Sequence, residues 1–457
     1  MALDAMRLFG CFKCCNRAEY DEDVSYYAMS SGGMIDNSWT RDDYLRLGNY
    51  IGDSESIQIL FIDYFPYERE DIDALMGGLS RNRSIQLVEI STDLSNHAFT
   101  ELGRVMCNME NIQTLEFCSP PQTPNRRSII GPEYADSIAS VIGQCKHVNN
   151  IVFQRCTFRI RGVFSKISVA LHSKGQQLEQ LSFQRSNIGR DGCVPLGKTL
   201  KCLATSNLKY LDLSYCAIDD DGLRTLVTGI NYCNPLHLCL SGNFISAAGL
   251  AYLSVLFESE SCSLEELSLH GVRIGDDGAA ALADGLKSNT SLKHLTFATA
   301  GSRITAVGWS AFSRLLCDTS SINNTYSSNH TLEVIGDRGR ATYLTLNRNH
   351  QQYAAKYKIL LQHPDIHLQP FFQWDLKFLP LVADWFDKAL VINETIVSFS
   401  SKELQRRKVS AVYQFLLGTP LLEVSDHYIK VMQNQNSPAK RNKTKRFSIN
   451  RFFIHSK

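Results

Sequence analysis

No segment of this sequence is apolar for long enough to cross a membrane. The 457 residues are 44% hydrophobic, but no stretch approaches the ~20 consecutive apolar residues that a membrane-spanning helix requires. Met1–Tyr20 also lacks the apolar run of ~7 or more residues that marks a secretory signal. We therefore expect a cytoplasmic protein in a reducing compartment, with free thiols.

A net charge of either sign is also missing. Lysine and arginine number 47 and aspartate and glutamate 46, so the formal net charge is +1 at pH 7. A nucleic-acid partner requires a basic footprint on the surface that binds it. We therefore expect that no nucleic acid binds the main body of the chain.

The common catalytic signatures are absent from the sequence. It contains no GxxxxGK phosphate loop, no HExxH zinc motif and no GxSxG nucleophile elbow. Its 14 cysteines fall mainly within expected strands and helices, where cysteine serves as a small buried residue, and they form no paired framework. We expect a protein that is not an enzyme, with no catalytic residue, no cofactor and no metal.

Five Asn-x-Ser/Thr sequences occur, at Asn82, Asn289, Asn323, Asn329 and Asn393. Glycosylation at such sequences requires the secretory route, which is not expected here, so we interpret them as chance matches. Some of them mark the turn after a predicted helix.

The sequence does contain one pattern written three times, over residues 208–234, 235–263 and 264–289. In the first copy, alternation places Leu211 and Leu213 on one face of a strand and Tyr210 and Asp212 on the other. Apolar residues after Gly222 then recur at intervals of three and four, the spacing of an amphipathic helix. One strand and one helix cannot bury their apolar faces alone, so the copies must stack.

Two registers extend this pattern along the chain. The residue at the head of each predicted strand recurs every 27 to 30 residues, with one exception. The spacing between Ile112 and Val148 is 36, because a proline-rich insertion occupies residues 119–133. The predicted strand heads are Ile57, Ile85, Ile112, Val148, Leu178, Leu208, Pro235, Leu264 and Leu292. The glycine that opens each helix recurs at Gly162, Gly192, Gly222, Gly249, Gly278 and Gly308. A strand followed by a helix with a period of about 28 residues is a leucine-rich repeat. We predict an α/β fold: a curved solenoid with parallel strands on the concave face, helices on the convex face and a helical C-terminal cap.

Long repeats with a helix in every unit resemble the ribonuclease-inhibitor-like class of leucine-rich repeat proteins, which includes the Ran GTPase-activating protein and the NOD-like receptors. The resemblance covers about Ile57–Leu332. It implies a non-enzymatic scaffold or adaptor that binds a protein partner, and we expect a monomer. The alternative that the class suggests is a regulator of a small GTPase, similar to a GTPase-activating protein.

The region after the repeats carries a second resemblance. SSNHTL (327–332), LNRN (346–349), FLPLVADW (378–385) and VYQFLLGTP (412–420) occur in this order. The same order is similar to the C-terminal region of uncharacterised leucine-rich repeat proteins of unicellular algae. This resemblance implies no activity.

The sequence is predicted to divide into five parts. These are a flexible N-terminal tail with a cysteine cluster, an N-terminal cap helix, the repeat solenoid, a helical C-terminal cap and a basic disordered tail, at residues 1–39, 40–56, 57–336, 337–425 and 426–457.

The concave strand face is where a repeat solenoid usually binds its partner, so its polar positions form the candidate site. Glu89 and Glu116 occupy equivalent positions of neighbouring repeats, which suggests an acidic spot for a basic partner segment. Three histidines gather in the C-terminal repeats, and their different offsets within the strands favour solvated side chains over metal ligands. The predicted partner-binding residues are Glu89, Glu116, Gln180, Gln184, Tyr210, Asp212, His237, Glu266, His270 and His294.

A cysteine cluster lies among apolar and basic residues near the start of the chain. Cys11, Cys14 and Cys15 suit reversible palmitoylation, and two or three acyl chains would hold the protein at a membrane. A metal site would need a fourth ligand that no nearby spacing supplies. A disordered tail with incidental thiols is the preferred interpretation, and lipidation is the alternative.

A basic run at residues 440–446 precedes Phe452, Phe453 and Ile454. A solvated tail is the preferred interpretation of this run. Peripheral contact with a membrane surface of acidic lipids and nuclear import are the two alternatives. We therefore expect a cytoplasmic protein, with membrane association or the nucleus as alternatives.

Overall fold

The computed structural model describes residues 26–29, 39–62, 68–92, 94–119, 128–158, 162–203, 207–337, 342–350 and 354–363. The cluster of Cys11, Cys14 and Cys15, the basic run 440–446 and the predicted helices after residue 363 lie outside these residues. The chain forms two compact units: Met1–Gly285 with His294–Ile304, and Leu286–Lys293 with Thr305–Lys457.

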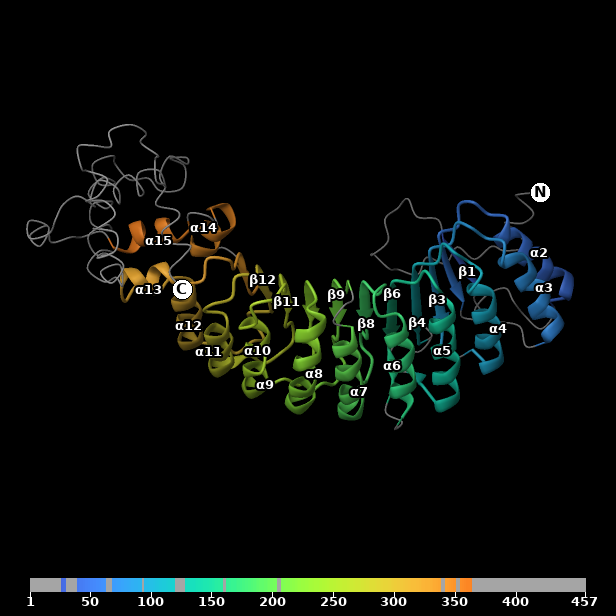
Figure 1. Ribbon diagram of the computed structural model, residues 1–457, viewed down its shortest axis with the longest axis horizontal. Helices are drawn as coiled ribbons and strands as arrows, with labels where there is room; N and C mark the ends of the chain where they lie inside the picture. The colour runs from blue at the N-terminus through green and yellow to red at the C-terminus, as the bar shows by residue number, and fades with distance from the viewer. Residues whose placement is uncertain are drawn as a thin grey trace, which may run out of the picture. The chain divides into compact units, whose positions relative to one another are not determined.

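The described strands of the first unit form one long parallel sheet and a second, two-stranded sheet. In the long sheet the strands pair in chain order, and β5 and β7 form the two-stranded sheet (Figure 1). The strands that follow a predicted strand-head residue are β2 (Ile59–Ile62), β3 (Leu87–Ser91), β4 (Thr114–Cys118), β6 (Asn150–Gln154), β8 (Gln180–Ser182), β9 (Tyr210–Asp212), β10 (His237–Cys239), β11 (Glu266–Ser268) and β12 (His294–Thr296). Each begins two residues after its predicted head. The predicted leucine-rich repeat register is therefore confirmed.

A helical segment follows almost every strand of this unit. The helices are α2 (Arg41–Gly52), α3 (Arg69–Leu79), α4 (Asn96–Met106), α5 (Pro132–Gln144), α6 (Val163–Ser173), α7 (Gly189–Cys202), α8 (Asp220–Cys233), α9 (Ala247–Ala251), α10 (Ser254–Phe257) and α11 (Gly275–Gly285). The first turn of α8 shows how the sequence favours a helix there. The Asp219 side chain accepts a hydrogen bond from the Gly222 backbone N–H at 2.8 Å, and two further aspartates occupy the first turn. Carboxylates at this end complement the helix dipole.

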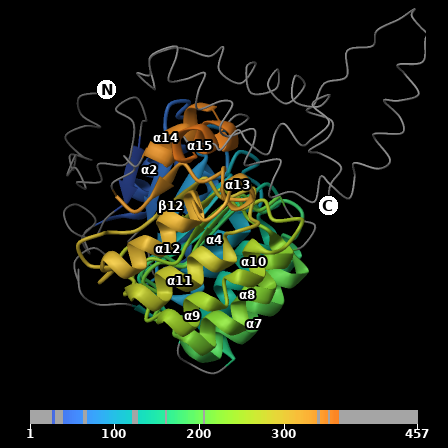
Figure 2. The ribbon, with the colours of Figure 1, turned by 90° about the vertical axis from the view of Figure 1, so that its left-hand side faces the viewer.

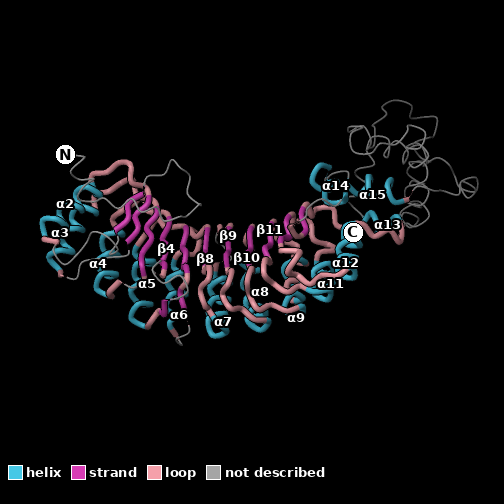
Figure 3. Tube along the Cα trace, turned by 180° about the vertical axis from the view of Figure 1, so that it is seen from behind, coloured by secondary structure: helices cyan, strands magenta, loops and turns pink. Residues whose placement is uncertain are grey.

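Strands and helices of the first unit form separate layers. Figure 3 shows the strands along one side and the helices along the other, and Figure 2 shows α7 to α11 stacked side by side. Neighbouring strands lie about 4.8 Å apart and packed helices about 8–10 Å apart. Stacking repeats therefore bends this unit, with strands on its concave side and helices on its convex side, as predicted.

Glycine lets two of these helices touch. A Cβ atom at Gly229 of α8 would lie 2.4 Å from the Gly197 carbonyl oxygen in α7. No larger residue fits at that distance, so the two backbones pack directly against each other.

Phenylalanine forms the centre of the core in the middle repeats. Phe117, Phe153 and Phe183 stack in successive repeats with ring centroids 5.2 and 5.0 Å apart, and Phe158 meets Phe153 edge to face at 5.5 Å. All four rings are buried. This stack joins the strand layer across three repeats.

Three short strands lie where no strand was predicted. Tyr26–Met29, inside the predicted flexible tail, forms β1 and pairs in parallel with β2. Its two tyrosines favour extended backbone, and the open edge of β2 offers unpaired backbone groups. At the end of the proline-rich insertion, β5 (Ser128–Ile129) pairs with β7 (Cys156–Thr157).

Buried asparagines close the turn between helix and strand. Asn82 is 1% exposed. Its Nδ2 donates hydrogen bonds to the carbonyl oxygens of Ile51 and Ser54 at 2.6 and 3.0 Å. Its Oδ1 accepts hydrogen bonds from the backbone N–H groups of Ser84 and Ile85. Backbone N–H groups two and three residues onward bond in the same way to the Oδ1 atoms of Asn289 and Asn329. These three Asn-x-Ser/Thr sequences therefore mark the turn after a helix, as expected, and their asparagines share a structural role there.

We expect Asn82→Ala to lower the free energy of unfolding by about 2–4 kcal/mol, because it leaves buried backbone donors and acceptors without partners. Urea unfolding followed by circular dichroism measures this loss. Asn82→Asp is the matched comparison, since it keeps the acceptor oxygen and replaces the donor with a carboxylate oxygen facing the carbonyl groups of Ile51 and Ser54. A loss below about 1 kcal/mol for the alanine variant would show that water replaces the amide.

The second unit holds the remaining described elements. They are α12 (Ala306–Leu316), α13 (Ile322–Tyr326), β13 (Val334–Ile335), α14 (Thr342–His350) and α15 (Ala354–Gln362). The backbone N–H groups of Glu333 and Val334 donate to the Lys293 carbonyl oxygen at 2.7 and 3.1 Å. α15 packs against both α13 and α14.

A buried lysine ties α15 to the loop before β13. Lys358 is 0% exposed, and its Nζ donates to the Asn329 carbonyl oxygen at 2.9 Å and lies 3.0 Å from His330 Nδ1. His330 Nε2 lies 2.8 Å from the Tyr326 carbonyl oxygen, so Nε2 carries the proton and Nδ1 accepts. A neutral amine has two N–H groups, which match these two acceptors. Burial lowers the pKa of Lys358 to about 7.

Candidate functional site

The strand register places five of the predicted residues in a single row across the sheet. Gln180 pairs with Tyr210, Tyr210 with His237, His237 with Glu266, and Glu266 with His294. We call these five residues the polar row. They come from five consecutive repeats, because side chains at the same strand position point to the same face of a parallel sheet.

Contacts along the polar row orient its central members. His237 Nδ1 lies 3.1 Å from Glu266 Oε2, and the rings of Tyr210 and His237 lie 5.7 Å apart between centroids. The side chains of His237 and Glu266 are each 39% exposed, and Tyr210 is 40% exposed. The centre of the row therefore exposes part of an aromatic ring and of a hydrogen-bonded His–Glu pair.

Burial keeps the phenol and thiol groups of this region protonated. The pKa of Tyr210 is raised by burial first and then by the Asp212 carboxylate. Burial and the same carboxylate raise the pKa of Cys239. Burial also raises the thiol pKa to about 12 at Cys156 and Cys193. These thiols are poor nucleophiles at neutral pH, since the thiolate is the reactive form.

Glu89 and Glu116 face each other in paired register, as their equivalent repeat positions suggested. Their carboxylate oxygens and Cys118 Sγ all lie within 4.8 Å of one another. Glu116 is 7% exposed, and Cys118 Sγ donates to Glu116 Oε1 at 3.3 Å. This acidic cluster sits on β3 and β4, and its role in binding stays a prediction.

The other predicted residues lie outside the polar row. Asp212 is 8% exposed, and its Oδ1 accepts from the Ser214 backbone N–H at 2.8 Å, so it supports the turn after β9. Gln184 Oε1 accepts from Gln154 Nε2 at 3.1 Å. His270 lies four residues beyond Glu266, so it does not join His237 and His294, which are themselves separated by β11. The three histidines therefore do not converge.

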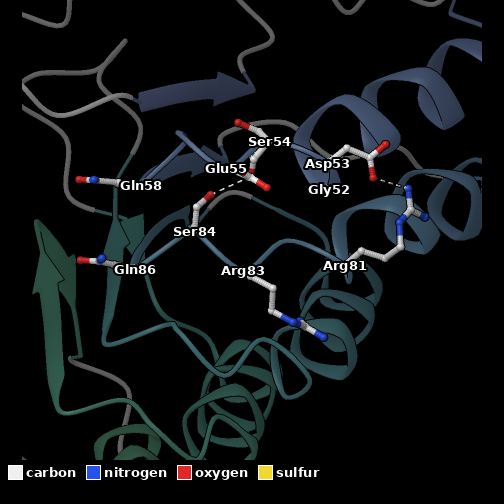
Figure 4. Close-up of a pocket in the computed structure, with 9 residues that line it drawn as sticks. All are labelled: Gly52, Asp53, Ser54, Glu55, Gln58, Arg81, Arg83, Ser84 and Gln86. Carbon is white, nitrogen blue, oxygen red and sulfur yellow. Dashed lines mark hydrogen bonds and ion pairs between the residues drawn. The ribbon is translucent and has the colours of Figure 1, made fainter.

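A shallow cavity of about 710 Å³ opens at the helix-to-strand turns of the first two repeats. Figure 4 shows Arg81 directed at Asp53, where Nη2 lies 3.0 Å from Oδ1, while Arg83 points away from that pair. Arg83 Nη1 lies within 3.4 Å of the carbonyl oxygens of Ser80 and Asn82. The lining is polar and its charges are largely compensated, so the polar row is the better candidate site.

Sequence reasoning missed a second group of residues at the rim of the strand layer. Arg155, Arg185 and Tyr215 follow β6, β8 and β9, and each has a positive φ. The only signal in the sequence is that Gly242 and Gly271 take the same place in the next two repeats.

A sequence comparison finds the leucine-rich repeat in two segments of this fold. A family model described as leucine-rich repeat matches residues 205–227 and 260–283. Among the described residues, no helix is long and apolar enough to span a membrane.

The relatives that the chain resembles share this repeat region. Mouse NACHT, LRR and PYD domains-containing protein 5 is 31% identical over 153 residues, covering 33% of this chain and 13% of that protein. The human protein of the same name is 29% identical over 31% of this chain and 12% of its own length. Human NACHT, LRR and PYD domains-containing protein 13 is 27% identical over 47% of this chain and 20% of that protein. The matches thus span about a fifth or less of each relative.

One solved structure is also similar. The crystal structure of a TLR13–ssRNA13 complex aligns with 60% of this chain and 36% of that chain, at 12% identity and a TM-score of 0.32.

Proposed function

We propose that this protein is a non-enzymatic scaffold or adaptor that binds a protein partner through the concave strand face of its repeats. The observation that carries the proposal is the polar row, in which consecutive repeats present Gln180, Tyr210, His237, Glu266 and His294 in register. Partly exposed aromatic and charged groups at the centre of such a face have the composition of binding hot spots.

The relatives support this proposal through their shared repeat region. The segments that match them belong to proteins whose names combine a leucine-rich repeat region with other domains. A recognition role for the repeats accords with that arrangement. We assign the repeats to the ribonuclease-inhibitor-like class as part of this proposal, because they are long and have a helix in each unit. We further propose a monomer in the cytoplasm, with membrane contact through the termini and nuclear import as the remaining hypotheses.

Regulation of a small GTPase is the alternative function. It predicts that adding the protein accelerates GTP hydrolysis by a co-purifying GTPase. Unchanged hydrolysis would leave only the scaffold proposal.

We expect the double variant Tyr210→Ser/Glu266→Gln to weaken partner binding at least tenfold, equal to about 1.4 kcal/mol. The reason is that both side chains lie at the centre of the polar row, where truncation costs most. Affinity capture from native lysate with the full chain, followed by mass spectrometry and titration of the captured protein, gives the measurement.

Tyr232→Ser provides the matched control. Tyr232 lies on α8 and is 48% exposed, close to the 40% of Tyr210, but it belongs to the helix layer. Equal loss of binding in both variants would point to destabilised repeats. Unchanged binding by the double variant, with its fold intact, would move the binding site away from the polar row.

A further inference from the structure

One backbone position recurs in the left-handed region of five consecutive repeats. The φ values are 57° at Arg155, 56° at Arg185, 55° at Tyr215, 67° at Gly242 and 76° at Gly271. Only two of the five are glycine, although glycine adopts this conformation at the lowest cost. Three successive repeats thus hold a large side chain where an L-residue is disfavoured.

The neighbouring repeats impose this conformation. The backbone N–H of Arg155 donates to the Gln184 carbonyl oxygen at 3.1 Å, that of Arg185 to Ser214 at 2.8 Å, and that of Tyr215 to Ser241 at 2.7 Å. The bond from Gly242 to His270, at 2.7 Å, continues the series. The turn is therefore built from backbone bonds between repeats and does not need the arginine or tyrosine side chains. Strained residues of this kind often mark functional positions.

Two of the large side chains stack on each other at the rim. The Arg185 guanidinium lies over the Tyr215 ring, 5.8 Å from its centroid. That ring in turn covers Gly242, where an added Cβ would lie 2.3 Å from Tyr215 Cδ1. Tyr215 is 46% exposed, and Phe244, two residues beyond Gly242, is 74% exposed. We call Arg155, Arg185 and Tyr215 the left-handed row.

The two arginines carry charge that the described part of the chain leaves uncompensated. Within those residues, no carboxylate forms an ion pair with Arg155 or Arg185. Consecutive turns hold the backbones of these two residues about one strand spacing apart, roughly 4.8 Å along the sheet. A carboxylate between two guanidinium groups gains charge-assisted hydrogen bonds from both.

We propose that the left-handed row, together with Phe244, binds an acidic segment of a partner protein. A partner carboxylate lies between Arg155 and Arg185, and an apolar or aromatic partner side chain packs on Tyr215 and Phe244. This inference rests on the proposed function, since it assigns the chemistry of the segment that reaches the rim of the same strand layer.

A nucleic acid fits this surface less well than an acidic peptide. A phosphate backbone binds through a track of many cations, whereas the row offers two. Glu116 pairs in register with Val152 on β6, the strand that leads to Arg155. A carboxylate on the adjoining strand repels phosphates that would continue along the sheet, while a peptide needs only one or two acidic side chains.

Binding of four fluorescent probes by the full chain tests the proposal. Three are twelve-residue peptides in which phenylalanine alternates with glutamate, glutamine or lysine, and the fourth is a twelve-nucleotide single-stranded RNA. Fluorescence anisotropy should show the glutamate peptide binding at least tenfold more tightly than the glutamine peptide. Arg155→Gly/Arg185→Gly should remove that difference and leave the melting temperature nearly unchanged, because Gly242 and Gly271 already occupy this turn.

A variant on the helix layer controls for overall charge. Arg190→Gln/Arg224→Gln also removes two positive charges, from side chains that are each 63% exposed, and should bind the glutamate peptide as the unaltered protein does. Equal affinity for the glutamate and glutamine peptides, or tighter binding of the RNA, would overturn the inference. Loss of the native partner in Tyr210→Ser/Glu266→Gln, but not in the double-glycine variant, would overturn it while leaving the proposed function standing.

Discussion

Phe153→Ala is expected to lower the free energy of unfolding of the first unit by about 3–5 kcal/mol, the usual cost of emptying a buried phenylalanine site. Phe153 is 0% exposed and stacks between Phe117 and Phe183, with Phe158 against its edge. Its neighbours belong to a repeat array whose strand pairing fixes their positions, so they have little freedom to close the cavity.

Urea unfolding combined with hydrogen exchange measures both the size and the place of this loss. Each repeat contacts mainly its neighbours, so protection should fall most in β4, β6 and β8 and least in β11. Phe153→Leu is the matched comparison and should cost less, about 1–2 kcal/mol, because it keeps most of the buried volume. Equal losses for the two variants would show that ring stacking contributes little to this core.

Stability of the second unit is expected to rise between pH 6 and pH 9, by about 2 kcal/mol, through Lys358. Its pKa is about 7 in the folded protein against 10.5 for the free side chain. Between those values the unfolded chain binds one more proton than the folded chain, so raising the pH favours folding. The stability that deprotonation of Lys358 contributes falls as the pH falls from 10.5, and it is lost once the pH has fallen through 7.

The other titrating groups around Lys358 set the range of the measurement. Burial first, and then Lys358, lowers the pKa of His330 to about 4, so His330 adds a further loss only below about pH 6.5. Burial raises the pKa of the Cys317 thiol and, to about 12, that of Tyr343; their contributions oppose that of Lys358 only above about pH 9. Burial lowers the pKa of His363, and hydrogen bonds from Ser320 lower that of Asp318.

Lys358→Met is the variant that isolates the effect. It keeps the length of the side chain and removes the titrating amine, so the part of the rise above about pH 6.5 should disappear, while the part that His330 contributes below that pH should remain. Urea equilibration at each pH, followed by a hydrogen-exchange pulse at one fixed pH over residues 306–335, reports opening of this unit. An unchanged rise in the methionine variant would assign the dependence to other groups.

Periodicity predicted the strands because each repeat begins with the same alternation of apolar and polar residues. Leu211 and Leu213 alternate with polar residues in the sequence, and both are buried in the structure. The predicted heads, from Ile57 to Leu292, precede their strands by a constant two residues. The same alternation correctly placed Tyr210, His237 and Glu266 on one strand face, although their part in binding is still a prediction.

Local pattern did not predict which of those residues touch. His237 bonds to Glu266 because β10 and β11 pair in a particular register, which depends on all the residues between the two strands. The flexible tail was predicted from composition alone, yet Tyr26–Met29 finds a partner in β2. Whether such a short segment becomes a strand depends on the open edge of a neighbouring strand, which lies elsewhere in the sequence.

The sequence alone determined the repeat architecture, its register and the polar character of its strand face. The physical reason is that leucines recurring with a fixed period can be buried only when the repeats stack in that register. Tertiary structure decided the rest. It placed Arg155, Arg185 and Tyr215 in left-handed turns through backbone bonds to neighbouring repeats. It also buried Lys358, and burial lowers the pKa of that amine to about 7. Backbone strain and desolvation arise from contacts between segments far apart in the chain, so no local pattern carries them.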